Sequence, residues 1–384
     1  MQRTAWLPFS IYSVIGTVTF MPLLILPALV GVLVDEGGMS ESFAGWVASA
    51  NFTGGATAAL LMALRMHGID LRRVATIGIL CSIGGDVLSA WVAHQGPAFL
   101  LLRFLTGFAA SLAHVAASAA FARHDDVERG YGLFITLQFI VSGLGLYIVP
   151  VYAATLGVPG MFLMIAALQA GALVLLRALP GRAPAEAAGG GMERAILLAA
   201  VTLFALIGYG LFEAANTAQF TYIERWGVAL AYPDERIGVA LMVASLVGIP
   251  GAFMVVVVGH RYGYLRPLLL GMAIAVTGLL LLILTRAYQW YFVAGCFLGF
   301  AWAFCLPYIQ SLMASIDRNG SAVAAGSSIA TIGGAVGPGL AAIVVTGGNY
   351  RTVFLLSIVL YAIAAASFVA SRARAPANIP EVIT

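Results

Sequence analysis

The sequence predicts an all-α, polytopic membrane protein with twelve transmembrane helices. Of its 384 residues, 61% are hydrophobic and only 9% are charged, whereas about 25% of a typical soluble domain is charged. The apolar residues form long continuous blocks of the length that crosses a bilayer, roughly 20 residues. Because these blocks lack the alternating short strands of a membrane barrel, helices are the expected spanning elements.

The apolar blocks, separated by short polar segments, place the predicted helices. They cover residues 7–34, 42–64, 74–93, 97–122, 131–155, 159–179, 195–222, 237–258, 265–285, 288–315, 322–346 and 351–371. Pro22 and Pro27 predict a bend in the first helix, because proline interrupts the helical hydrogen-bond ladder.

A linker rich in Gly, Ala and Pro divides these helices six plus six. We expect an N-terminal six-helix bundle over residues 1–179, a cytoplasmic linker over 180–194 and a C-terminal six-helix bundle over 195–384. Fourteen loop arginines fall on one predicted side of the membrane, and four fall on the other: Arg225, Arg236, Arg286 and Arg351. Since cytoplasmic loops are enriched in basic residues, both termini are predicted to be cytoplasmic.

Several classes of partner and chemistry are not expected. The net charge of +3 comes from scattered arginines rather than a basic cluster, so we expect no nucleic-acid partner. The chain has no HExxH helix, no nucleophile beside a base, no Gly-rich phosphate loop and no histidines at ligand spacing. The sequence therefore predicts no enzyme, no metal and no cofactor.

The two halves carry similar motifs at corresponding places. The loop after the second helix reads RMHGIDLRR, and the loop after the eighth reads HRYGYLR. Both are short, basic and centred on glycine. The fifth helix of each half carries a Gly/Pro interruption, which ends at Pro150 in the first half and at Pro338 in the second. Such matches are typical of a transporter built from a duplicated unit.

On these motifs the chain resembles the major facilitator superfamily over essentially its full length. The loop signature of the family is matched by Gly68, Arg72 and Arg73 in the first half and by His260, Arg261 and Gly263 in the second, with His in place of the usual acid. Arg103 and Gly107 match the family motif of Arg, three residues, then Gly. The Gly-Pro motif of many drug-exporting antiporters is absent, since Val149 precedes Pro150.

The resemblance implies two bundles that rock about a central cavity with a site near the membrane midplane. It also implies a gating role for the loop signature. For Arg103 it implies that the side chain senses a proton carried by a neighbouring acid.

Four ionisable residues stand out inside the predicted helices, away from their ends: Asp86, Arg103, His114 and Glu213. A charge at the bilayer centre costs at least ~2.5 kcal/mol, so each is a functional candidate. Asp86 and Arg103 flank one helical hairpin at depths within about 3 Å of each other, which predicts a pair. The pair is either static or proton-sensitive; the remaining alternative is that Asp86 faces elsewhere. His114 shares a face of its helix with Arg103; it either carries a proton or donates to a backbone carbonyl.

A polar stripe on the seventh helix is the main candidate for the substrate path. Glu213, Asn216 and Gln219 follow one another at three-residue spacing, with Tyr209 nearby. A stripe of this kind would not face lipid; the alternative is hydrogen bonding between helices. The further candidates for substrate binding are Arg103, Asn51, Gln138, Tyr308 and Gln310.

The sequence thus predicts a secondary active transporter in a bacterial inner membrane. It would move a small organic solute, anionic or zwitterionic by preference, by alternating access and with protons as the coupling ion. We expect it to work as a monomer surrounded by lipid, in a direction that the sequence leaves open. The alternatives are a drug/proton antiporter that exports amphipathic compounds and a membrane receptor or scaffold without transport.

Overall fold

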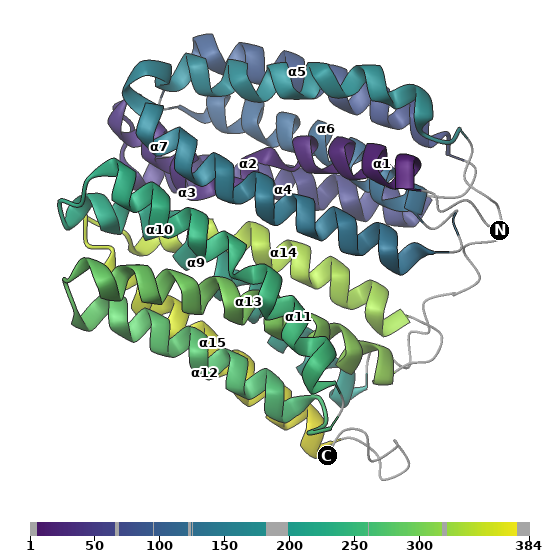
Figure 1. Cartoon of the computed structure of the whole chain (residues 1–384), viewed down its shortest axis with the longest axis vertical. Coiled ribbons are helices and arrows are strands. Elements are labelled where there is room, and N and C mark those ends of the chain that lie inside the picture. The colour runs from purple at the N-terminus through teal and green to yellow at the C-terminus, as the bar shows by residue number, and fades with distance from the viewer. Residues whose placement is uncertain are drawn as a thin grey trace. The chain divides into compact units, whose positions relative to one another are not determined.

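The computed structural model of the chain describes residues 6–65, 69–94, 96–121, 124, 126–181, 199–259, 261–316 and 321–374. Within these ranges the regular elements are helices, and the all-α prediction is confirmed. The chain forms two compact units, Met1–Ala188 and Gly189–Thr384. Each unit is a bundle of long helices, which Figure 1 colours from purple to teal in the first unit and from teal-green to yellow in the second.

The first unit contains seven α-helices and one short 3-10 helix in its described part. They are α1 (Trp6–Thr19), α2 (Met21–Leu24), α3 (Leu26–Asp35), α4 (Glu41–Arg65), α5 (Leu71–Val92), α6 (Pro97–Phe121), α7 (Val127–Leu173) and η1 (Val174–Ala178). α4 and α6 pack along each other, as do α5 and α6. α1 packs against α6 and α7, and α5 packs against α7.

The first predicted span is bent, as its prolines predict. It consists of α1, α2 and α3 instead of one continuous helix, and Pro22 and Pro27 each lie in the first turn of the piece that follows a break. The first turn of a helix accommodates proline because its N–H groups have no intrahelical partner.

The fifth and sixth predicted spans are joined in α7. Gly157 interrupts this element with φ 57° and ψ −176°, and Pro159 follows it. A residue with a side chain rarely adopts a positive φ, so glycine suits this sharp change of direction. We call residues 127–156 the first limb of α7 and residues 158–173 its second limb.

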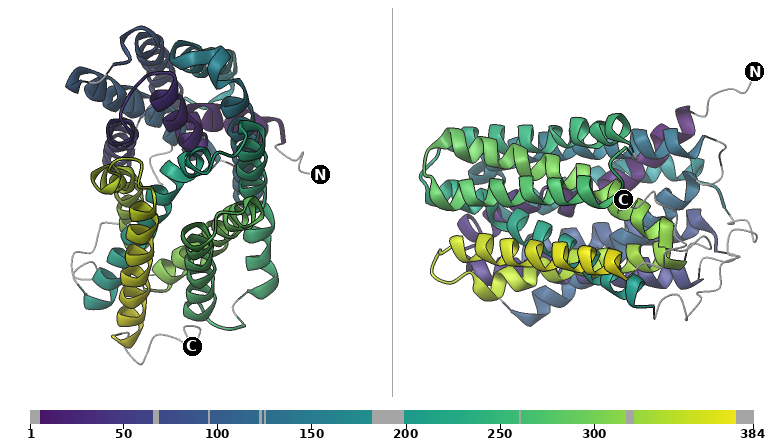
Figure 2. Two further views of the ribbon diagram at one scale, coloured as in Figure 1. Left: turned by 90° about the vertical axis from the view of Figure 1, so that its left-hand side faces the viewer. Right: turned by 90° about the horizontal axis from the view of Figure 1, so that it is seen from below.

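The second unit contains seven α-helices in its described part. They are α9 (Ala200–Ala229), α10 (Asp234–Leu246), α11 (Gly248–Val258), α12 (Leu265–Leu284), α13 (Tyr288–Ile316), α14 (Ser321–Val344) and α15 (Arg351–Ala373). α9 packs between α14 and α15, whereas α13 packs against α10, α11 and α12. α15, the yellow helix of Figure 2, packs against α9 and α12.

The seventh helix is longer than predicted, which corrects one loop assignment. We expected it to end at residue 222 and Arg225 to lie in an outer loop, but α9 continues to Ala229. Arg225 is 3% exposed and makes two hydrogen bonds to the carboxylate of Glu224, which is 4% exposed. The charges are thus paired inside the helical bundle instead of marking its end.

Nine helices in the described part of the chain are long and apolar enough to span a membrane. One of them, Arg129–Ala178, covers two predicted spans because of the break at Gly157. The broken first helix and α4, which is 25 residues long, lie at the remaining two predicted spans. The prediction of a polytopic membrane protein is confirmed.

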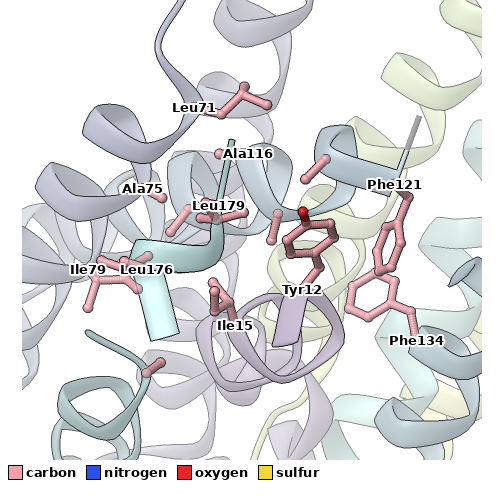
Figure 3. Close-up of a cluster of buried hydrophobic side chains, with 14 of the residues drawn as sticks. Tyr12, Ile15, Leu71, Ala75, Ile79, Ala116, Phe121, Phe134, Leu176 and Leu179 are labelled. Carbon is pink, nitrogen blue, oxygen red and sulfur yellow. The ribbon is translucent and has the colours of Figure 1, made fainter. Parts of the chain in front are cut away.

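A continuous apolar cluster joins α1, α5, α6, α7 and η1 of the first unit (Figure 3). Tyr12 and Ile15 of α1 meet Ile79 of α5, Phe121 of α6 and Leu176 of η1 within it. α6 contributes alanines that are fully buried, at positions 113, 116, 117 and 120. Small side chains at these positions let neighbouring helices approach closely, which is the usual basis of helix packing in membranes.

Glycine contacts bring specific helix pairs together in both units. In the first unit, a Cβ atom on Gly107 would collide with the carbonyl oxygen of Asn51, which joins α6 to α4. In the second unit, a Cβ atom on Gly299 would collide with the carbonyl oxygen of Ala244, and one on Gly333 with that of Gly210. Gly107 of the motif RFLTG and Gly333 of the motif GGAVGP are thereby explained by close packing.

Candidate functional site

The first candidate site is the ion-pair cluster, which we define as Asp86, Ser89, Arg103, Phe162 and Gln169. Arg103 Nη1 donates to Asp86 Oδ1 at 2.7 Å and to Ser89 Oγ at 3.1 Å. Gln169 Nε2 donates to the other carboxylate oxygen, Asp86 Oδ2, at 3.1 Å. Asp86, Arg103 and Gln169 are all 0% exposed. The predicted pairing of Asp86 with Arg103 is confirmed.

Three helical segments build this cluster. Asp86 lies on α5, Arg103 on α6, and Phe162 and Gln169 on the second limb of α7. The guanidinium carbon of Arg103 lies 4.7 Å from the centre of the Phe162 ring, in a cation–π arrangement. Arg103 Nε and Nη2 have no hydrogen-bond partner among the described residues. Since removal of one member of a buried pair leaves an uncompensated charge, the cluster can lock α5, α6 and α7 together.

His114 lies elsewhere in the first unit. Its Nδ1 is 2.9 Å from the carbonyl oxygen of Gly16 on α1, and its ring stacks on Phe20 with centroids 4.4 Å apart. It also meets Phe134 on the first limb of α7. His114 and Arg103 therefore contact different helices, although they share a face of α6. A neutral ring that donates from Nδ1 keeps Nε2 as a proton acceptor.

The second candidate site is the Glu213 cluster, which we define as Tyr209 and Glu213 on α9 with Trp302 and Gln310 on α13. Trp302 Nε1 donates to Glu213 Oε2 at 3.4 Å. Tyr209 is one turn before Glu213, and its hydroxyl group is hydrogen-bonded to Gln310. Glu213 is 9% exposed, and no basic side chain in the described part of the chain pairs with it. The cluster therefore presents a buried carboxyl group whose charge the described residues do not balance.

The rest of the predicted stripe on the seventh helix is partly bonded to itself. Gln219 Nε2 donates to Asn216 Oδ1 at 3.3 Å. Gln219 is 2% exposed, and its Oε1 has no partner among the described residues. Asn216 is half-buried. The stripe thus keeps one buried acceptor available for a further donor.

The other candidates for substrate binding lie on several helices, α4, α7 and α13. Asn51 Nδ2 donates to the carbonyl oxygen of Arg103 at 3.1 Å, which ties α4 to α6. The Tyr308 hydroxyl donates to the carbonyl oxygen of Gly259 at 3.2 Å, which ties α13 to the end of α11. Gln138 is half-buried on the first limb of α7. Within the second unit, Gln310 joins Tyr209 in the Glu213 cluster, whereas the hydroxyl group of Tyr308 is bonded to Gly259.

The loop signature of the first half begins a helix. Arg72 and Arg73, predicted to lie in a loop, belong to the first turn of α5, which Asp70 caps by accepting a hydrogen bond from the backbone N–H of Arg73 at 3.0 Å. Arg72 Nε donates to the carbonyl oxygen of Leu179 at 2.9 Å. Arg72 thereby fastens the chain that leaves η1 to the start of α5.

The second copy of the signature is described in part. Gly68 of the first copy and His260 of the second lie outside the described residues. Arg261 is exposed, and Gly263 is buried with φ 69°, in the left-handed region that favours glycine. The turn before α12 therefore requires glycine at this position.

Two features of the site were missed in the sequence. Gln169 was not singled out, although an amide in an otherwise apolar segment was a signal, because an unpaired amide is costly in hydrocarbon. Glu224 and Arg225 were missed because the seventh helix was ended too early. The continuing apolar and aromatic residues, Trp226 and Val228, were the available signal there.

Known proteins share this architecture. The sequence profile of the Major Facilitator Superfamily matches residues 9–317. The chain belongs to the Major Facilitator Superfamily. It is 27% identical over 380 residues to an uncharacterised transporter of this superfamily from Bacillus subtilis (strain 168), YceJ, covering 93% of this chain and 95% of that one.

Solved structures of this fold include two of the nucleoside transporter NupG. A crystal structure of a mutant NupG superposes with a TM-score of 0.75 and 14% identity, over 95% of this chain and 99% of that one. A second NupG structure has a TM-score of 0.73 and 13% identity, over 96% of this chain and 99% of that one. At this level of identity the likeness establishes a shared fold and leaves the substrate open.

Proposed function

We propose that the chain is a proton-coupled secondary transporter that moves a small zwitterionic organic solute by alternating access. Membership of the superfamily supports transport, and the substrate class is inferred from the surroundings of Glu213. Its carboxyl group is buried and receives one hydrogen bond from the neutral indole of Trp302. A buried carboxylate without a cationic partner is costly, so a proton or a cationic group of the solute stabilises it.

The surroundings of Glu213 favour a solute that brings hydrogen-bond donors. The rings of Tyr209 and Trp302 offer faces that attract an ammonium group, and Gln310 adds an amide. The preference for an anionic solute rested partly on Arg103, which is fully buried against Asp86. We therefore favour a zwitterion, whose ammonium group faces Glu213, over a simple anion.

A second candidate is the exchange of protons for amphipathic organic cations. The same observation favours it, because an unbalanced carboxylate beside aromatic rings also suits a lipophilic cation. The two candidates differ in the charge of the solute: a zwitterion carries an acidic group that a lipophilic cation lacks.

Two sites are proposed for the proton. Asp86 would take up a proton and release its hold on Arg103, which would loosen the contact between α5 and α6. His114 offers a second position through its Nε2 atom. We place the protein in the cytoplasmic membrane of a bacterium, as a monomer that contacts lipid, solute and protons and no nucleic acid.

A thermal-shift panel tests the proposed substrate class. The full-length protein in detergent would be heated with amino acids, betaines, nucleosides, sugar acids and tetraphenylphosphonium. We expect a zwitterion to raise Tm, because a ligand that binds the folded state stabilises it by about 2.7 kcal/mol at a hundredfold excess over Kd. Glu213→Gln should abolish the shift. The exposed control Glu235→Gln, on the first turn of α10, should keep it.

The outcome separates the candidates. A shift with tetraphenylphosphonium alone would favour the antiporter. A shift with sugar acids that survives in Glu213→Gln would contradict the role of Glu213. Any stabilising solute would then be tested in proteoliposomes loaded with a pH-sensitive dye, where proton movement on addition of the solute reports coupling.

A further inference from the structure

Gln169 completes the hydrogen bonding of Asp86 from a third helix. Asp86 presents two carboxylate oxygens, and each receives one donor from a different neighbour. Arg103 Nη1 serves Oδ1 at 2.7 Å, and Gln169 Nε2 serves Oδ2 at 3.1 Å. All three side chains are fully buried. Gln169 is therefore the group that meets the carboxylate oxygen not taken by the ion pair.

The amide of Gln169 can serve either protonation state of that oxygen. A primary amide carries an NH₂ donor and a carbonyl acceptor, whereas a guanidinium group carries donors alone. Gln169 Oε1 has no partner among the described residues. Rotation of the amide by half a turn would bring Oε1 to the position from which Nε2 now donates. A protonated Asp86 Oδ2 would then have an acceptor for its O–H group.

Among the described residues, no other charged side chain contacts Asp86. α5 packs against α6, α7 and η1. Arg103 faces Asp86 from α6, and Gln169 and Phe162 line this cluster from the second limb of α7. Arg177 on η1 is exposed. Among the described residues, the protonation of Asp86 is thus felt directly by Arg103 and Gln169.

We propose that Gln169 is a positioning residue that follows the protonation state of Asp86 by rotating its side-chain amide. When a proton from the aqueous phase binds Asp86 Oδ2, the hydrogen bond from Gln169 Nε2 is lost and one from Asp86 to Gln169 Oε1 forms. Asp86 becomes neutral, and Arg103 keeps its charge. The second limb of α7 stays bonded to α5 in both states while the ion pair to α6 weakens. This inference rests on the proposed proton uptake by Asp86.

Infrared difference spectra of the full-length protein across a pH series test the inference without a known solute. The C=O absorption of protonated Asp86 is identified by its loss in Asp86→Asn, and that of the Gln169 amide by its loss in Gln169→Met. We expect the amide absorption to shift as the Asp86 absorption appears, with one common midpoint. In Gln169→Met, which keeps the side-chain length but removes the donor, the proton affinity of Asp86 should rise about tenfold, or one pH unit.

Controls and contrary outcomes separate the inference from the proposed function. Gln289→Met removes an exposed amide near the start of α13, outside both clusters, and should leave the Asp86 midpoint unchanged. If Gln169→Met does not fold, Gln169→Leu replaces it. Asp86 that titrates with a constant Gln169 absorption, or with the same midpoint in the variant, overturns the inference alone. If Asp86 never takes up a proton while the protein is folded, the proposed proton uptake by Asp86 and the inference both fail.

Discussion

The ion-pair cluster and the Glu213 cluster each bury an acid, but they balance it in different ways. Asp86 has a guanidinium partner and an amide at hydrogen-bond distance, so its needs are met within its own unit. Glu213 has one long hydrogen bond, at 3.4 Å, from a neutral indole. A buried charge without an internal partner needs one from outside. The comparison indicates that an ion pair joins helices in the first unit. The Glu213 cluster of the second unit instead presents a carboxyl group that no described basic side chain pairs with.

The two units resemble each other more in how their helices pack than in where their charged residues lie. In each unit, two helices approach each other closely at a glycine. Gly107 of α6 meets Asn51 of α4 in the first unit, and Gly299 of α13 meets Ala244 of α10 in the second. Gly333 brings α14 against α9 in the same way. The duplicated architecture is therefore visible in backbone contacts, while the ionisable residues differ between the halves. Close packing of helices requires small residues in each half, whereas the ionisable residues need not be the same in the two halves.

The largest expected effect breaks the ion-pair cluster. Arg103→Ala would leave Asp86 buried without its cation, which should lower the free energy of unfolding by about 3–5 kcal/mol. Unfolding in detergent, followed by circular dichroism, measures this. The double variant Asp86→Asn/Arg103→Ala should recover most of the loss, because no charge remains buried. Equal losses in both variants would contradict an ion pair that stabilises the unit.

The next effect tests the packing that the units share. Gly107→Ala and Gly299→Ala each place a Cβ atom against a backbone carbonyl oxygen and should each lower the free energy of unfolding by about 1–3 kcal/mol. Gly84 on α5 has open space around its Cα atom, so Gly84→Ala is the matched control, with no loss. A similar loss in the control would contradict close approach as the cause, because alanine favours a helix more than glycine does.

A smaller effect on stability is expected at Glu213. Glu213→Gln keeps the side-chain shape and the contact with Trp302, so the free energy of unfolding should change by less than about 1 kcal/mol. Solute binding or its pH dependence should nevertheless be lost in proteoliposomes. A change in apparent affinity at fixed pH would mark a binding group, and a shifted pH profile with affinity kept would mark a coupling group. Wild-type behaviour in both measurements would remove Glu213 from the mechanism.

The smallest change sharpens the description of the seventh helix. Asn216→Cys, in a background free of Cys81, Cys296 and Cys305, should fold normally and react with a water-soluble thiol reagent if the stripe meets the aqueous path. A stabilising solute should slow that reaction. Ala218→Cys, from a fully buried position on α9, is the control and should stay unreactive. An unreactive Asn216→Cys would assign the stripe to contacts between helices.

Much of the fold could be predicted from the sequence of each segment by itself. The apolar blocks predicted the spans, Pro22 and Pro27 predicted the bend in the first of them, and helix geometry placed Asp86 and Arg103 at one depth. Helix ends were less accurate: α9 runs past residue 222, and Arg72 and Arg73 begin α5 instead of preceding it. A paired charge can stay inside a helix, so a charged residue alone does not mark a helix end.

The sequence by itself determined how deep each candidate side chain lies, because depth depends on the fixed rise per residue of a helix and on the length of the apolar block. Only the tertiary structure decided which neighbours each side chain meets. Gln169 reaches Asp86 from a segment 83 residues away in the chain, and Trp302 meets Glu213 across 89 residues. Such contacts depend on how helices rotate and pack against each other, which small side chains on several helices set together. No single segment carries that information, so the partners of Asp86 and Glu213 emerged only from the packed helices.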